Sequence, residues 1–99
     1  MVRVQIPVHL RALASIPSGE VQLAIAPPVT IHAIVSAVEE RYPMLKGTMR
    51  DHVTLKRRPM IRFYACQEDW SHEEQTKELP ERIATGAEVF YVIAAIAGG

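Results

Sequence analysis

The strongest constraint on the fold lies in the last apolar stretch, EVFYVIAAIA, at residues 88–97. From Val89 onward nearly every side chain is apolar, so a strand formed here has no polar face to present to water. Such a strand either lies at the centre of its sheet or keeps one apolar face for a partner. We therefore expect the end of the chain to return between strands formed earlier.

Two segments near the start of the chain alternate apolar and polar residues, as half-buried strands do. In VRVQIPV, residues 2–8, the apolar set is Val2, Val4, Ile6 and Val8. In EVQLAIA, residues 20–26, it is Val21, Leu23 and Ile25. A loop with a proline and a glycine lies between the segments, so we expect them to form an antiparallel pair.

The period then changes over TIHAIVSAVEERYP, residues 30–43. The spacing of the apolar residues is that of an amphipathic helix: Ile31, Ile34, Val35 and Val38. Thr30 is placed to cap the first turn, and Pro43 stops the helix. Glu39, Glu40 and Arg41 are interpreted as a solvated helix end. One apolar stripe therefore has to be buried against the sheet.

The remaining segments complete an α+β order of strand, strand, helix, strand, irregular segment and strand. PMIRFYA, residues 59–65, is predicted to be a strand with Ile61, Phe63 and Ala65 on one face. Residues 44–58 give a weak pattern, with a short helix broken near Gly47. The acidic segment 66–81 is turn-like, and Trp70 and Leu79 are expected to attach it to the core. One domain over residues 1–99 is expected.

Charge and cysteine content exclude several classes of function. Eleven basic and eleven acidic side chains cancel, which gives no general attraction to nucleic acid or to an anionic membrane. The basic cluster Lys56, Arg57, Arg58 and Arg62 is interpreted as solvated rather than as a nucleic-acid site. One cysteine cannot form an internal disulfide, and no stretch approaches the about 20 apolar residues that span a bilayer. We expect a soluble, cytoplasmic protein.

Catalytic and metal-binding motifs are not found in the sequence. Cys66, Glu68, Asp69 and His72 lie close together, but structural zinc draws four ligands from paired motifs and no second pair exists. Cys66 is better explained as a buried residue beside a turn. No glycine-rich phosphate loop, carboxylate pair or nucleophile elbow is present. We expect a substrate of enzymes and not an enzyme.

The sequence ends AAIAGG, and residues 94–99 are expected to form an extended C-terminal tail. Glycine has no Cβ, so Gly98 and Gly99 allow close approach to another chain or to a phosphate. Ala97 keeps the tail slim, and Ile96 suits an apolar notch. We interpret the tail as a segment delivered to the active sites of other proteins. The alternative is an inert, frayed end.

Several stretches together resemble the ubiquitin-like sulfur-carrier proteins, a family that includes the small subunit of molybdopterin synthase and the thiamine-pathway sulfur carrier. They are HLRALA at residues 9–14, VTIHAIVSAVEERYPML at 29–45, Leu79, TGAEV at 85–89 and the terminal Gly98-Gly99. The resemblance implies a β-grasp fold, with a mixed sheet, one main helix on one face and a flexible Gly-Gly tail.

The resemblance also implies a covalent role for Gly99. In the family an ATP- and magnesium-dependent adenylyltransferase, related to ubiquitin-activating enzymes, converts the terminal carboxylate into an acyl-adenylate. A sulfur donor then replaces AMP to leave a thiocarboxylate, and an acceptor such as the large subunit of molybdopterin synthase receives the sulfur. The carrier itself binds no cofactor.

The partner surface is predicted on the last strand. Phe90 and Val92, on the face away from the helix, and Ala94 are expected to contact the adenylyltransferase or the acceptor. The alternative is that segment 44–58 covers them. Molybdopterin synthesis is the favoured destination; thiazole formation, cysteine synthesis and tRNA thiolation stay open. So do a ubiquitin-like modifier that is conjugated through Gly99 and an interaction module with an inert tail.

Overall fold

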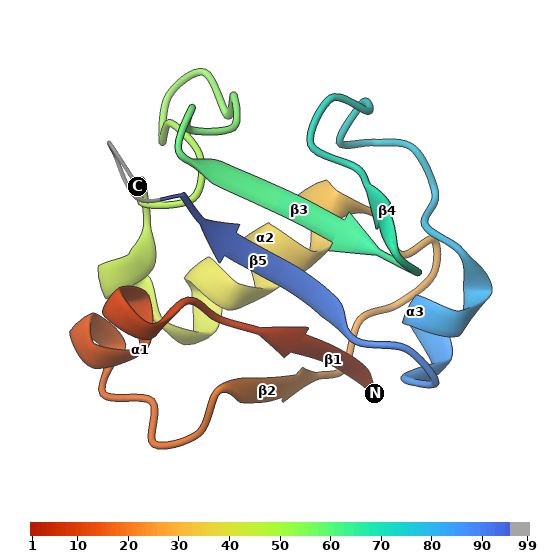
Figure 1. Ribbon diagram of the computed structural model, residues 1–99, viewed down its shortest axis with the longest axis horizontal. Coiled ribbons are helices and arrows are strands. Elements are labelled where there is room, and N and C mark those ends of the chain that lie inside the picture. Colours follow the sequence, from red (N-terminus) through yellow and green to blue (C-terminus); the bar gives the residue numbers. More distant parts are fainter. Residues whose placement is uncertain (96–99) are drawn as a thin grey trace.

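The structure, a computed structural model, describes residues 1–95 of the chain. It consists of one mixed sheet with the main helix packed across one face (Figure 1). In chain order the elements are β1 (Val2–Gln5), α1 (Val8–Ala14), β2 (Glu20–Leu23), α2 (Ile31–Arg41), the 3-10 helix η1 (Pro43–Leu45), β3 (Ile61–Ala65), β4 (Glu68–Asp69), α3 (Glu81–Thr85) and β5 (Phe90–Ala94). The expected α+β class is confirmed.

The last strand lies in the middle of the sheet, as its apolar character predicted. The strand order is β2-β1-β5-β3-β4. β5 runs parallel to β1 and antiparallel to β3, while β2 and β4 pair antiparallel at the two edges. The parallel pair requires a long crossover, which the helix α2 and the segments after it supply. The start of β5, at Phe90 and Tyr91, is therefore paired with an earlier strand on each side of it or directly next to such a pair.

Helix α2 begins and buries its apolar stripe as predicted. The Thr30 hydroxyl accepts a hydrogen bond from the Ala33 amide at 3.0 Å, which caps the first turn. The apolar stripe is fully buried: Ile31, Ile34, Val35 and Val38. It belongs to the same core as Phe63 and Phe90, whose ring centroids stack 5.8 Å apart. The helix and the inner faces of β3 and β5 thus form one hydrophobic core.

The first strand is shorter than predicted. It ends at Gln5, and Val8 begins α1 with 71% of its surface exposed, so the prediction of an alternating strand through Val8 was wrong. Pro7 explains the change, because it has no amide for the ladder and its ring favours the start of a helix. The helix α1 then buries Leu10 and Ala14. The short helix α3, which buries Ile83, was not predicted either.

Segment 46–58 is fastened to α2 by a buried ion pair. Arg50 Nη2 donates to Glu39 Oε1 at 2.8 Å and to Ser36 Oγ at 2.9 Å. Arg50 Nη1 lies 3.2 Å from Nδ1 of His32. These partners follow one side of α2, apart from the apolar stripe. The prediction that Glu39 is solvated was therefore wrong, because Arg50, on the segment that follows η1, packs over its carboxylate and buries it.

A second arginine joins segment 46–58 to the loop that follows β4. Arg57 Nε donates to the carbonyl of Ser71 at 2.9 Å, and its Nη1 donates to the carbonyl of Ile61 at 2.7 Å. Arg57 is half-buried, so it is not a solvated member of a basic cluster. Trp70 and Leu79 are buried and attach the acidic segment to the core as predicted.

We predict that Arg50→Met lowers the free energy of unfolding by about 3 kcal/mol, because it leaves the buried Glu39 carboxylate without its cation. Urea denaturation measures the change. Arg41→Met is the matched control: Arg41 is exposed and donates to the Gln22 carbonyl, so its loss should cost about 1 kcal/mol or less. Equal losses in the two variants would contradict a structural role for the buried pair.

Candidate functional site

The two faces of β5 have different environments. Phe90 is 0% and Val92 3% exposed, whereas Tyr91 is 40% and Ile93 44% exposed. The prediction that Phe90 and Val92 face away from the helix was therefore wrong, since both lie in the core. An all-apolar strand carries no alternation that shows which set points inward. Here the cross-strand pairing of Val92 with the buried Phe63 places that set in the core.

Tyr91 and Ile93 form the centre of what we call the outer sheet face, on the side of the sheet away from α2. Their cross-strand partners on β3 are Tyr64 and Arg62. The face therefore has an apolar and aromatic centre on its central strand.

Charged groups surround this apolar centre. Arg3 on β1 forms an ion pair with Glu20 at 3.0 Å; the hydrogen bond, and then the charge, of Glu20 raise the pKa of Arg3 above its ordinary value. Arg62 Nη1 lies 3.3 Å from Nε2 of His72. Hydrogen bonds from Ser71 are the main cause of a lowered pKa at Asp69, which keeps that carboxylate charged. Both signs of charge are thus available around the centre.

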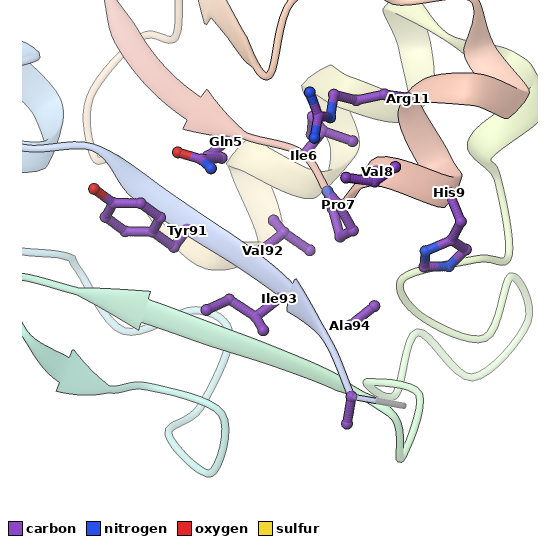
Figure 2. Close-up of a pocket in the computed structure, with 11 residues that line it drawn as sticks. Gln5, Ile6, Pro7, Val8, His9, Arg11, Tyr91, Val92, Ile93 and Ala94 are labelled. Carbon is purple, nitrogen blue, oxygen red and sulfur yellow. The ribbon is translucent and has the colours of Figure 1, made fainter. Parts of the chain in front are cut away.

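A groove opens at the end of the sheet where β1 and β5 separate. It has a volume of about 640 Å³, and we call it the end groove (Figure 2). One wall comes from the end of β1 and the start of α1, including Ile6, Pro7 and Val8. The other wall is β5 from Tyr91 to Ala94, together with Ala95, the residue after it. Ala94, which was predicted to contact a partner, lines this groove.

β5 ends at Ala94, and Ala95 is the last described residue. Ala94 still pairs with Ile61, and the Ala95 amide donates to the carbonyl of Met60 at 2.7 Å. Ala94 therefore belongs to the sheet and not to a tail that begins at residue 94. The predicted covalent residue Gly99 and the predicted access residues Gly98, Ala97 and Ile96 lie outside the described residues. β5 runs toward the end of the sheet where α1 lies, away from the end where the N-terminus lies (Figure 1).

Other candidate groups do not assemble into a site within residues 1–95. In that part of the chain no three His, Cys, Asp or Glu side chains gather closely enough to hold a metal ion. Cys66 and Gln67, with φ of 51° and 66°, form the turn between β3 and β4, where Cys66 is partly buried. None of the helices in residues 1–95 has the length and apolar character needed to cross a bilayer.

Comparisons with known proteins find likeness at the level of structure. No protein-family model and no curated protein matches the sequence. A chain in the structure of the Amycolatopsis orientalis BexX/CysO complex matches with a TM-score of 0.75 and 24% identity, covering 100% of both chains. SAMP1 from Haloferax volcanii matches with a TM-score of 0.73 and 12% identity, covering 98% of this chain and 97% of its own. The chain has the ubiquitin-like β-grasp fold.

In this β-grasp domain the exposed residues of the central strand were missed by sequence reasoning, although one signal could have found them. The hydroxyl of Tyr91 is the single polar group among the side chains of FYVIA, residues 90–94. A buried hydroxyl needs a partner, so it favours an outward position for Tyr91 and, by alternation, for Ile93.

We predict that one substitution has different costs on neighbouring residues of β5. Val92→Thr places a hydroxyl in the core and should lower the free energy of unfolding by about 1 to 3 kcal/mol. Ile93→Thr places the same group on the outer sheet face and should change it by about 0.5 kcal/mol. Urea denaturation of both variants checks the assignment, and the reverse order of costs would show that the two faces are exchanged.

Proposed function

We propose that this chain is a ubiquitin-like sulfur carrier whose Gly99 carboxyl group is activated and converted to a thiocarboxylate. The observation that carries the proposal is a β-grasp domain whose central strand leads directly into residues 96–99, which end in Gly-Gly. The sequence motifs shared with sulfur carriers support it. So does the matching fold in a complex of CysO with BexX, in which one protein is bound to another.

The sheet supplies a firm base for such an end. β5 is paired with β1 and β3, and the Met60 carbonyl holds Ala95 at the last point before residue 96. Four fully extended residues reach about 13 Å, enough to enter a catalytic cleft while the domain stays outside. Beyond Ile96 the segment contains only Ala97, Gly98 and Gly99, whose small side chains let a narrow cleft admit it.

Activation is required by the chemistry of the carboxyl group. A C-terminal carboxylate has a pKa of about 3.3 to 3.7, so it is an anion at neutral pH and a poor acyl donor. An adenylyltransferase joins one of its oxygens to the α-phosphate of ATP and releases pyrophosphate, with magnesium bound to the nucleotide. Sulfur from a donor then displaces AMP. The chain is a co-substrate in each step, and the partner enzymes supply the catalytic groups.

The outer sheet face is the proposed docking surface for the activating enzyme and for the acceptor. Tyr91 and Ile93 provide its apolar centre, in place of the buried Phe90 and Val92. Because residue 96 follows this same strand, a partner bound to the face is correctly placed to receive the tail. Molybdopterin synthesis is the destination that the sequence resemblance favours, with the large subunit of molybdopterin synthase as acceptor.

Intact-mass measurement tests the proposal. The full chain is incubated with a cognate activating enzyme, ATP, magnesium and a sulfur donor, and we expect the exchange of one oxygen for one sulfur. The mass before reaction checks that Gly99 carries the free carboxylate. Deletion of Gly99 is the control and should abolish the exchange.

The acceptor and the alternatives are separated in the same assay. Release of the sulfur to the large subunit of molybdopterin synthase would support the molybdopterin pathway. Release to an acceptor of thiazole formation, cysteine synthesis or tRNA thiolation would assign the carrier to that pathway instead. Ladders of higher-mass conjugates in cell extract, lost with Gly99, would instead identify a protein modifier. The carrier role would be refuted if neither the thiocarboxylate nor conjugates were formed.

Docking is tested by a charge placed at the centre of the outer sheet face. We predict that Ile93→Asp raises the KM of the activating enzyme for the carrier by about tenfold or more, because it puts an unpaired charge into an apolar contact. Val53→Asp makes the same change at an exposed apolar residue of segment 46–58 and should leave KM within about twofold. Equal effects at the two positions would contradict the assignment of this face.

A further inference from the structure

The ladder between β1 and β5 stops before β5 does. Gln5 and Tyr91 are the last pair. Beyond this pair the Ile6 amide donates to the carbonyl of Gly19 at 2.9 Å rather than to β5, and Pro7 has no amide hydrogen to donate. β5 continues for three more residues, paired only with β3 on its other side. A central strand therefore becomes an open edge for the length of the end groove.

Alternation along the strand shows which backbone groups are open. The Ala95 amide donates toward β3, to the carbonyl of Met60. Neighbouring residues of a strand direct their backbone groups to opposite sides, so the amide and carbonyl of Ala94 point toward the end groove. Among residues 1–95 neither group has a hydrogen-bond partner from α1 or the end of β1. These are the groups that an added strand would pair with.

The walls of the groove add apolar surface and one unpaired cation. Val8 and Ile93 are exposed apolar residues on opposite walls. Among the residues from 1 to 95 that line the groove, Arg11 is the single charged one apart from His9, and none carries a carboxylate. Within the described residues its guanidinium forms no hydrogen bond or ion pair, and its Nε is buried. Figure 2 shows Arg11 reaching back from α1 toward Ile6 at the end of β1.

We propose that the end groove binds an extended, acidic segment of a partner protein by strand addition. The main chain of the segment pairs with the amide and carbonyl of Ala94 in the place that β1 vacates. An apolar side chain of the segment packs between Val8 and Ile93. A neighbouring Asp or Glu of the segment pairs with Arg11. This recognition uses backbone groups for affinity and the arginine for selectivity, as strand-addition modes do.

An acidic peptide fits these groups better than other ligands do. The open backbone groups of β5 can form a ladder only with another peptide chain, because a small anion has no amide and carbonyl groups at the spacing of a strand. The Arg11 guanidinium is best paired with a carboxylate, which a neutral or basic strand does not have. The proposal does not depend on thiocarboxylate chemistry, because it uses no residue beyond Ala95.

The test is a titration of the isotope-labelled full chain with the peptide Ac-Glu-Val-Thr-Val-Glu-NH2, followed by NMR. We expect the largest amide shifts at Ala94 and its neighbours and slower hydrogen exchange of the Ala94 amide. Replacing both glutamates by lysine should abolish binding. N-methylation of alternate peptide amides, on the edge that pairs with β5, should do the same by blocking the ladder.

A matched pair of variants isolates the cation. Arg11→Gln should weaken binding of the acidic peptide about tenfold, the loss expected for one charge-assisted pair. Lys56→Gln removes the same charge from an exposed side chain of segment 46–58 and should leave binding unchanged. Unfolding midpoints of both variants confirm that the fold is retained.

Several results would overturn the proposal. They are no shift at Ala94 at millimolar peptide, equal binding of acidic and basic peptides, and shifts confined to the outer sheet face or to β2 and β4. Protection of the Ala94 amide that rises with protein concentration would assign the groove to a second copy of the chain. Protection in the free monomer that disappears on deletion of residues 96–99 would assign it to the chain itself. The carrier role and this inference can fail independently. If the chain forms no thiocarboxylate but binds the peptide at Ala94, the carrier role is refuted and the groove proposal is retained.

Discussion

The pairing of β5 on both sides is the interaction on which the rest of the structure depends. The last strand joins two antiparallel pairs, β1 with β2 and β3 with β4, into one sheet. Without β5 the two pairs would have no hydrogen bonds to each other. The inner faces of β1 and β3 would then not be joined in one sheet against α2. The first residues of β5 are paired with β1 as well as β3, whereas Val92, Ile93 and Ala94 are paired with β3 alone.

Those parts of the fold whose signal lies within one element could be predicted from the sequence. The period of α2 and its Thr30 cap identified the helix and its buried stripe. The apolar run after Val89 identified a central strand, because a strand without a polar face is favoured at the centre of its sheet. The remaining order then left few topologies, and the β-grasp arrangement was among them.

Other features depend on contacts between distant segments, and no local pattern contains them. Glu39 has the sequence context of a solvated helix end, and its burial is decided by Arg50 on a segment with little periodicity. The inward set of β5 is decided by its register with β3. In both cases the sequence restricts the choices, and packing selects one. The same reason applies to the end groove, which depends on where β1 leaves the sheet.

That departure also relates the two proposed surfaces. Pro7 ends β1 and begins α1 while β5 continues, so the open ladder edge, the exposed Ile93 and the last described residue, Ala95, lie within a few residues of one another along β5. A partner held in the end groove would fix the backbone next to Ala95. Residues 96–99 follow Ala95 directly, so a cleft of that partner within about 13 Å of Ala95 would be within the reach of four extended residues. A weak peptide contact at the groove could in this way determine which cleft receives the carboxyl end.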